Sequence, residues 1–136
     1  FDLIFDFKTC FLAVLGKAFQ KYGNEIEKQQ QVLIGLSDIM IKIYFVESAV
    51  LRTIKNHLSN KDFIFQEYMT KIYMFDTKNL IQKKSTEIIA NVCEGEEKNK
   101  MLNFIRKLCK YKNEPDIFSL REAVANQIIE KNNYCF

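Results

Sequence analysis

Apolar side chains recur at intervals of three and four residues along the whole stretch from Glu25 to Leu58. One series consists of Leu33, Leu36, Met40, Ile43, Val50, Ile54 and Leu58, and a second series of Ile34, Ile41, Phe45 and Ala49. This spacing is that of a helix, although Ile39 to Val46 is rich in the β-branched and aromatic residues that strands favour. A single helix of this length would span roughly 50 Å, and apolar residues on two of its sides are typical of a central element in a bundle.

The chain contains four glycines and one proline in 136 residues, so its turns should be few and its elements long. Sandwiches and barrels need many turns and are therefore excluded. Gly23 and Gly95 are placed to end helices, and Asn24 and Asp116 to cap the helices that follow. We predict an all-α fold, an up-and-down bundle of four to five helices that forms a single domain over residues 1–136. The expected helices cover residues 1–23, 24–58, 62–93, 96–111 and 116–131.

Composition excludes several classes of function. The net charge of +3 is too small to indicate binding to nucleic acid or to a membrane unless the charges cluster. The four cysteines, Cys10, Cys93, Cys109 and Cys135, form no C-x-x-C pair, and His57 is the single histidine, so no zinc or other metal site is expected. Scattered thiols are typical of a reducing compartment, and we expect a cytoplasmic protein. The sequence has no run of about 18 apolar residues that would span a membrane.

The sequence carries no G-x-G-x-x-G, P-loop or G-x-S-x-G motif. Two carboxylates nevertheless lie among apolar residues of the long central helix, with Lys42 and Arg52 near them. The first is Asp38, which stands four residues before Lys42. This spacing predicts an ion pair on the helix surface.

The second carboxylate, Glu47, is more informative because its neighbours one turn away are Ile43 and Leu51. Such a position predicts a side chain that points toward the core, where a carboxylate needs a partner or a raised pKa. Two interpretations stay open. Glu47 is either a general base or part of a structural ion pair with a basic residue of another helix, such as Arg121 or Arg106, and the ion pair is preferred.

A stripe of Lys100, Asn103, Lys107 and Lys110 marks the outer side of the fourth helix, and Met101, Ile105 and Leu108 mark its inner side. Basic stripes bind anions or nucleic acids when aromatic residues are interleaved with them. No such residues accompany this stripe. A solvated face is therefore the preferred interpretation, and no nucleic-acid partner is expected.

The segment from Glu27 to Arg52, which reads EKQQQVLIGLSDIMIKIYFVESAVLR, resembles the region after the catalytic domain in the longer acyl-CoA dehydrogenases, the very-long-chain type and its bacterial relatives. The matching residues are Gln31, Leu33, Ser37, Asp38, Ile43, Tyr44, Glu47, Ser48, Ala49, Leu51 and Arg52. The end of the chain, SLREAVANQIIEKNNYCF, is similar to the closing helix and tail of the same family. Its matches are Ser119, Leu120, Arg121, Ala125, Ile128, Ile129, Tyr134, Cys135 and Phe136. The two blocks stand in the family's order, so the resemblance covers most of the chain.

The resemblance implies that the chain is the C-terminal accessory domain of an FAD-dependent acyl-CoA dehydrogenase, an enzyme of fatty-acid β-oxidation. Such enzymes abstract an α-proton from an acyl-CoA with a glutamate and pass the β-hydride to the flavin. In the family that glutamate, the FAD site and the acyl-CoA site lie upstream of the matching residues, and Glu47 does not match the catalytic position. The fragment is therefore expected to be inactive and to hold no FAD, with Glu47, Arg52, Asp38 and Arg121 as structural polar residues.

By the same resemblance the domain packs on the upstream dehydrogenase core, and the parent is a homodimer because the domain occupies a surface that serves tetramer formation in shorter relatives. A neighbouring segment associates with a membrane surface in some relatives, but burial of the apolar first helix, Phe1 to Tyr22, against protein is preferred. This hypothesis predicts an exposed apolar face on the isolated chain. The alternative is a stand-alone helical module for an apolar ligand or a partner helix, which predicts an enclosed pocket between helices.

Overall fold

The computed structural model describes residues 2–58, 64–111 and 114–131. Its elements are α1 (Asp2–Tyr22), the 3₁₀ helix η1 (Gly23–Lys28), α2 (Gln30–Leu58), α3 (Ile64–Val92), α4 (Gly95–Leu108) and α5 (Ile117–Lys131). The predicted all-α bundle is confirmed. Across these described residues, no helix combines the length and the apolar character needed to cross a membrane.

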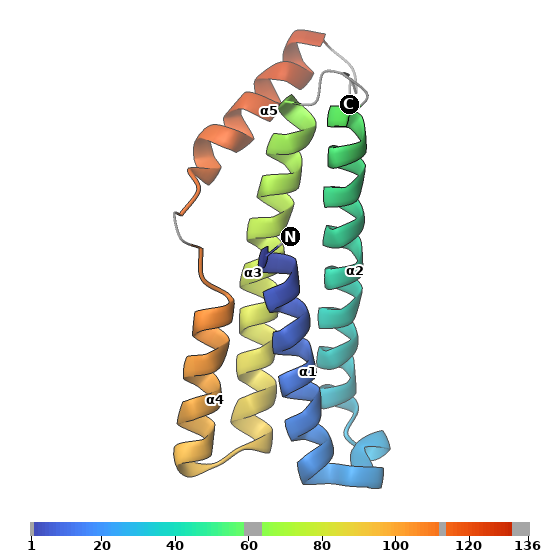
Figure 1. Ribbon diagram of the computed structural model, residues 1–136, viewed down its shortest axis with the longest axis vertical. Coiled ribbons are helices and arrows are strands. Elements are labelled where there is room, and N and C mark those ends of the chain that lie inside the picture. The colour runs from blue at the N-terminus through green and yellow to red at the C-terminus, as the bar shows by residue number, and fades with distance from the viewer. Residues whose placement is uncertain (1, 59–63, 112–113, 132–136) are drawn as a thin grey trace.

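The two longest helices, α2 and α3, run antiparallel to each other, and α1 lies against both over part of their length (Figure 1). α4 packs against α1 and α3 and continues the up-and-down order. α5 contacts α3 alone among the described helices, and it crosses the end of α3 at an angle (Figure 1). The bundle therefore consists of α1 to α4, and α5 is added at one end of it.

Two helix boundaries differ from the predicted ones by more than end fraying. The central helix begins at Gln30 rather than at residue 24, because η1 intervenes and Asn24 lies inside it. Gly23 has φ +53°, which sets the sharp change of direction after α1, and the buried side chain of Ile26 anchors η1 to the bundle. The fourth helix ends at Leu108 rather than at residue 111, where the buried Cys109 donates its N–H to the carbonyl of Ile105 at 3.0 Å.

The core is built mostly from isoleucine and valine and is closely filled between α2 and α3. Its fully or nearly fully buried apolar residues include Ile4, Phe7, Val14, Ile39, Val46, Ile81, Ile89 and Ile105. At Gly35 of α2, a Cβ atom would lie 3.1 Å from Cδ1 of Ile88 on α3. This glycine therefore permits a close approach of the two long helices, since a larger residue would displace Ile88.

The helix predicted over the β-branched stretch Ile39 to Val46 is confirmed, but its apolar residues are not all inside. Ile39, Ile43 and Val46 are buried between the helices, whereas Ile41 and Phe45 are exposed. α2 is therefore not a fully surrounded central element. It contacts α1, η1 and α3, and its remaining surface is open.

The start of α5 follows the sequence prediction for Asp116. Its Oδ1 accepts the backbone N–H of Ser119 at 3.1 Å, and its Oδ2 accepts the Ser119 hydroxyl at 2.7 Å. These two bonds form an N-terminal cap and lower the pKa of Asp116. The rest of α5 is weakly covered, because its one buried residue is Ile117 and Phe118 is 82% exposed.

Candidate functional site

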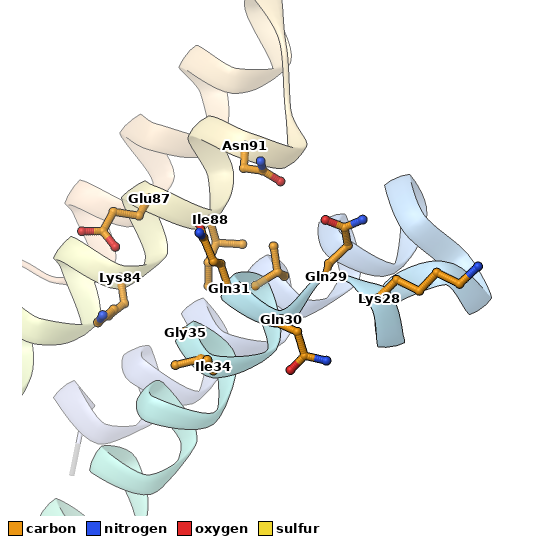
Figure 2. Close-up of a pocket in the computed structure, with 11 residues that line it drawn as sticks. Lys28, Gln29, Gln30, Gln31, Ile34, Gly35, Lys84, Glu87, Ile88 and Asn91 are labelled. Carbon is orange, nitrogen blue, oxygen red and sulfur yellow. The ribbon is translucent and has the colours of Figure 1, made fainter.

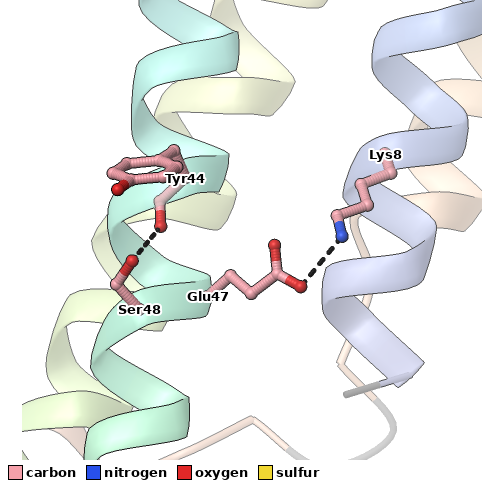
Figure 3. Close-up of polar contacts among 4 residues, drawn as sticks. All are labelled: Lys8, Tyr44, Glu47 and Ser48. Atoms are coloured by element: carbon pink, nitrogen blue, oxygen red, sulfur yellow. Dashed lines mark hydrogen bonds and ion pairs between the residues drawn. The ribbon is translucent and has the colours of Figure 1, made fainter.

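Glu47 forms an ion pair that joins α1 to α2. Its Oε1 accepts a hydrogen bond from Nζ of Lys8 at 2.9 Å, and the side chains of Glu47 and Lys8 are 33% and 48% exposed (Figure 3). The predicted partners Arg121 and Arg106 were wrong. The prediction failed because helix periodicity shows which side of a helix a residue faces, but not which residue of a neighbouring helix comes level with it. Glu47 lies at the rim of the α1–α2 contact and not inside the core.

The remaining predicted polar residues lie on other contacts between helices. Asp38 pairs with Lys84 of α3 at 3.8 Å and not with Lys42, as was predicted. The ammonium group of Lys42 lies instead over the ring of Tyr73 at 5.4 Å. Nη2 of Arg121 lies 3.4 Å from Oδ1 of Asp76, joining α5 to α3. These charges are at the edges of three separate contacts, so they do not form one site.

Arg52 is exposed on α2 and lines a groove of about 330 Å³ between α2 and α3. Ser48, Thr53 and Met69 also line this groove. Within the described residues, Arg52 forms no ion pair. The structure thus separates the four candidate polar residues.

A buried cluster of small polar groups was not predicted. Sγ of Cys10 on α1 lies 3.4 Å from Oγ of Ser85 on α3, and Cys109 lies beside Cys10 at the end of α4. The hydrogen bond with Cys10 and burial both raise the pKa of the Cys109 thiol, so it stays protonated at neutral pH. Cysteines that stand far apart in sequence gave no signal of this cluster. Among the described residues, no three His, Cys, Asp or Glu side chains are grouped to hold a metal ion.

The stripe on α4 is placed as predicted: Lys100, Asn103 and Lys107 are exposed, and Ile105 is buried. Lys110 is also exposed but lies beyond the end of the helix. Phe104, which stands four residues after Lys100 and three before Lys107, is 38% exposed, so one aromatic ring lies beside the stripe although the sequence analysis expected none.

The hollows between the helices are open grooves. Figure 2 shows one of about 620 Å³, where the start of α2 faces the end of α3. Its floor includes Gly35 and Ile88, and the exposed side chains of Gln30, Gln31 and Ile34 stand at its sides. The stand-alone binding module predicted an enclosed pocket, and this groove does not have that form.

The outer surface of α1 and α2 carries the exposed apolar face that the sequence predicted for a domain without its partner. We call this surface the α1–α2 apolar face. It comprises Phe5, Leu12 and Phe19 of α1 and Met40, Tyr44 and Leu51 of α2. The members on α1 recur every seven residues, which keeps them on one side of the helix.

The Lys8–Glu47 pair lies in the middle of this face. Phe5 and Leu12 stand three residues before and four after Lys8, and Tyr44 and Leu51 stand three before and four after Glu47. Residues at these spacings are neighbours on a helix surface, so apolar groups bracket the ion pair on both helices. These four apolar residues are 69%, 64%, 67% and 51% exposed, in that order. Exposed apolar residues that gather on one side of a protein are typical of a surface that another protein covers.

Comparison with known proteins identifies the family that the sequence resembles. Residues 6–107 match the family model for the acyl-CoA dehydrogenase C-terminal domain. A probable acyl-CoA dehydrogenase of Bacillus subtilis (strain 168) is 33% identical over 129 residues, which are 93% of this chain and 22% of that protein.

A solved structure is similar over almost the whole chain. The crystal structure of an acyl-CoA dehydrogenase complexed with FAD from Bacillus anthracis superposes with a TM-score of 0.95 at 28% sequence identity. The match covers 99% of this chain and 24% of that one. The chain thus spans about a quarter or less of the length of these two relatives.

Proposed function

This chain belongs to the family of acyl-CoA dehydrogenase C-terminal domains, and on that premise we propose that it is the accessory domain of a longer FAD-dependent acyl-CoA dehydrogenase. The longer protein removes two hydrogens from the α and β carbons of an acyl-CoA. The observation that carries this proposal is the likeness along 99% of the chain to the enzyme complexed with FAD. FAD supplies the acceptor for the hydride, and the proposal places it in the upstream core.

In this proposal the chain itself has a structural role. The α1–α2 apolar face is where the domain docks on the dehydrogenase core. Docking removes the exposed Phe5, Leu12 and Tyr44 from water, which is favourable by roughly 25 cal/mol for each Å² of apolar surface buried. Because Lys8 and Glu47 already neutralise each other in the middle of the face, docking buries no unpaired charge there.

Glu47, Asp38, Arg52 and Arg121 are assigned structural roles in the domain. Three of them tie neighbouring helices together at exposed edges, which suits positions that hold a bundle in register. Proton abstraction from the acyl-CoA is assigned to the core. We further expect the longer protein to be a homodimer, as the family resemblance implies, and to be cytoplasmic, as the scattered thiols indicate.

The test is a comparison of the longer protein with the 136-residue chain. Flavin absorbance and oxidation of acyl-CoA thioesters of several chain lengths are measured on both, and sedimentation gives the mass of each. The proposal expects a yellow, active dimer for the longer protein and a colourless, inactive 136-residue chain. A longer protein without flavin, or one that does not oxidise any acyl-CoA, would contradict it.

A further inference from the structure

We propose that the polypeptide that directly precedes Phe1 in the longer protein binds in the groove between α2 and α3 that lies next to the start of α1. This inference rests on the proposed function, because it requires a longer chain. The groove has a volume of about 320 Å³ and is lined by Val50, Thr53, Ile54, His57, Glu67 and Thr70. The segment continues α1 for about two helical turns, since the eight residues from Val50 to His57 rise about 10 Å along α2.

The groove continues the surface of α2 and α3 on which α1 packs. On α2, Ile39, Ile43 and Val46 are buried against the bundle, and Val50 and Ile54 follow at the same helical spacing. They therefore lie on the same side of α2. Val50 is still partly covered, whereas Ile54 is 38% exposed, so coverage stops along this line of residues.

The same continuity holds on α3. The buried Ile81 and Thr77 are followed, toward the start of the helix, by Thr70 and Glu67 at spacings of three, four and seven residues. In Figure 1 the N-terminus of α1 lies part-way along the α2–α3 pair, below this region. α5 does not close the groove, because it contacts α3 but not α2.

The floor of the groove is ready to be buried. The hydroxyls of Thr53 and Thr70 lie 2.7 Å apart and hydrogen-bond to each other, and Thr53 also donates to the carbonyl of Ala49 at 2.9 Å. At the rim, Glu67 pairs with Lys71 at 3.2 Å. A helix laid over these groups would leave neither threonine hydroxyl without a partner, so the cost of burying an unpaired hydroxyl is avoided there.

The occupant is expected to be an apolar helical strip. α1 packs into the bundle through buried residues at intervals of three, four and seven, which are Ile4, Phe7, Val14 and Ala18. The same pattern, run backward, puts apolar residues one, four and eight positions before Phe1. Those side chains would pack on Val50 and Ile54.

Cysteine labelling tests this proposal. Ile54→Cys places a thiol in the groove, and Arg52→Cys places one two residues away on the opposite side of α2. Maleimide labelling of each peptide is followed by mass spectrometry in three chains: the 136-residue chain, a chain that begins about twelve residues before Phe1, and the longer protein. We expect the Ile54→Cys thiol to react about tenfold more slowly in the second and third chains than in the first, because the groove must open before the reagent enters. The Arg52→Cys thiol should react equally in the first two chains.

The outcomes separate this proposal from the proposed function. Equal labelling of the Ile54→Cys thiol in all three chains contradicts the groove proposal, and so does protection that appears in the longer protein alone, which would assign the groove to the core. Flavin absorbance and acyl-CoA oxidation are read on the same longer protein. If those signals are absent but the thiol is protected, the dehydrogenase assignment is contradicted and the groove proposal is still supported.

Discussion

Nζ of Lys8 lies 2.9 Å from Oε1 of Glu47, and exposed apolar side chains bracket this ion pair on both of its helices. The arrangement gives an otherwise apolar surface a neutral polar centre. A partner that covers it can pair its own apolar residues with Phe5, Leu12 and Tyr44 without desolvating a lone charge. Glu47, which the sequence placed near the core, instead lies on an exposed surface among apolar side chains.

The Lys8–Glu47 pair should contribute little to the stability of the isolated chain, because both side chains are partly exposed. In a double-mutant cycle with Lys8→Met and Glu47→Gln, measured by urea unfolding, we expect a coupling energy of about 0.2–1 kcal/mol. Glu25→Gln, which removes the exposed pair with Lys28, is the matched control and should have a similarly small effect. A coupling above about 2 kcal/mol would show that the pair is a core interaction.

The close approach at Gly35 predicts opposite effects for the same substitution at two glycines. Gly35→Ala puts a Cβ atom 3.1 Å from Cδ1 of Ile88, and the overpacking cost of about 1–3 kcal/mol should outweigh the helix-propensity gain of about 0.5–1 kcal/mol, for a net loss of up to about 2 kcal/mol. Gly16→Ala in α1 meets no atom within 4 Å and should stabilise the chain by about 0.5–1 kcal/mol through helix propensity. Thermal and urea unfolding measure both effects.

Removal of Cδ1 of Ile88 should relieve the clash at Gly35. In an Ile88→Val background, Gly35→Ala is expected to become neutral or stabilising, so the two substitutions will not be additive. If Gly35→Ala destabilises the chain equally in both backgrounds, the contact with Ile88 is not its cause.

Tyr111 predicts a loss of stability at alkaline pH. Burial, followed by the charges of Glu114 and Asp76, raises the pKa of its phenol to about 12, and its ring stacks on that of Phe75 at 6.3 Å. An unfolded tyrosine loses its proton near pH 10, so between about pH 10 and pH 12 the unfolded state binds fewer protons than the folded state. The stabilising contribution of Tyr111 is full below pH 10 and falls as the pH rises, by at most about 1.4 kcal/mol per pH unit.

Tyr111→Phe keeps the stacked ring and removes the titrating group. The free energy of unfolding of this variant should decline less steeply than that of the wild type between pH 10 and pH 12. Urea unfolding curves across this range measure both slopes. Equal slopes would mean that the phenol is not protected from ionisation in the folded chain.

The helices could be predicted from sequence because their apolar period is long and turn residues are few. The period did not show where α2 begins, since Glu25 to Lys28 also fits a helix and only the burial of Ile26 in the folded bundle favours the tighter η1 turn. It also did not decide which apolar residues of α2 are inside. Ile39 and Ile41 are equally apolar, and only the positions of α1 and α3 make one buried and the other exposed.

The candidate site was predicted less completely than the fold. The exposed apolar face was predicted from the family resemblance, which implies a missing partner, and from the apolar first helix. The partners of Glu47 and Asp38 did not follow, because they depend on the level at which one helix meets another. The Cys10–Ser85 contact joins residues 75 positions apart, and nothing local in the sequence marks it.

The most direct test of this account asks whether the α1–α2 apolar face holds the domain on a flavin-bearing core. The longer protein from which this 136-residue stretch has been removed is mixed with the 136-residue chain, and sedimentation is followed by flavin absorbance. The flavin should sediment faster when the wild-type chain or the exposed-site control Phe118→Asp is present, and it should not when the chain carries Leu12→Asp with Tyr44→Asp. Flavin that sediments equally in all these mixtures would contradict docking through this face.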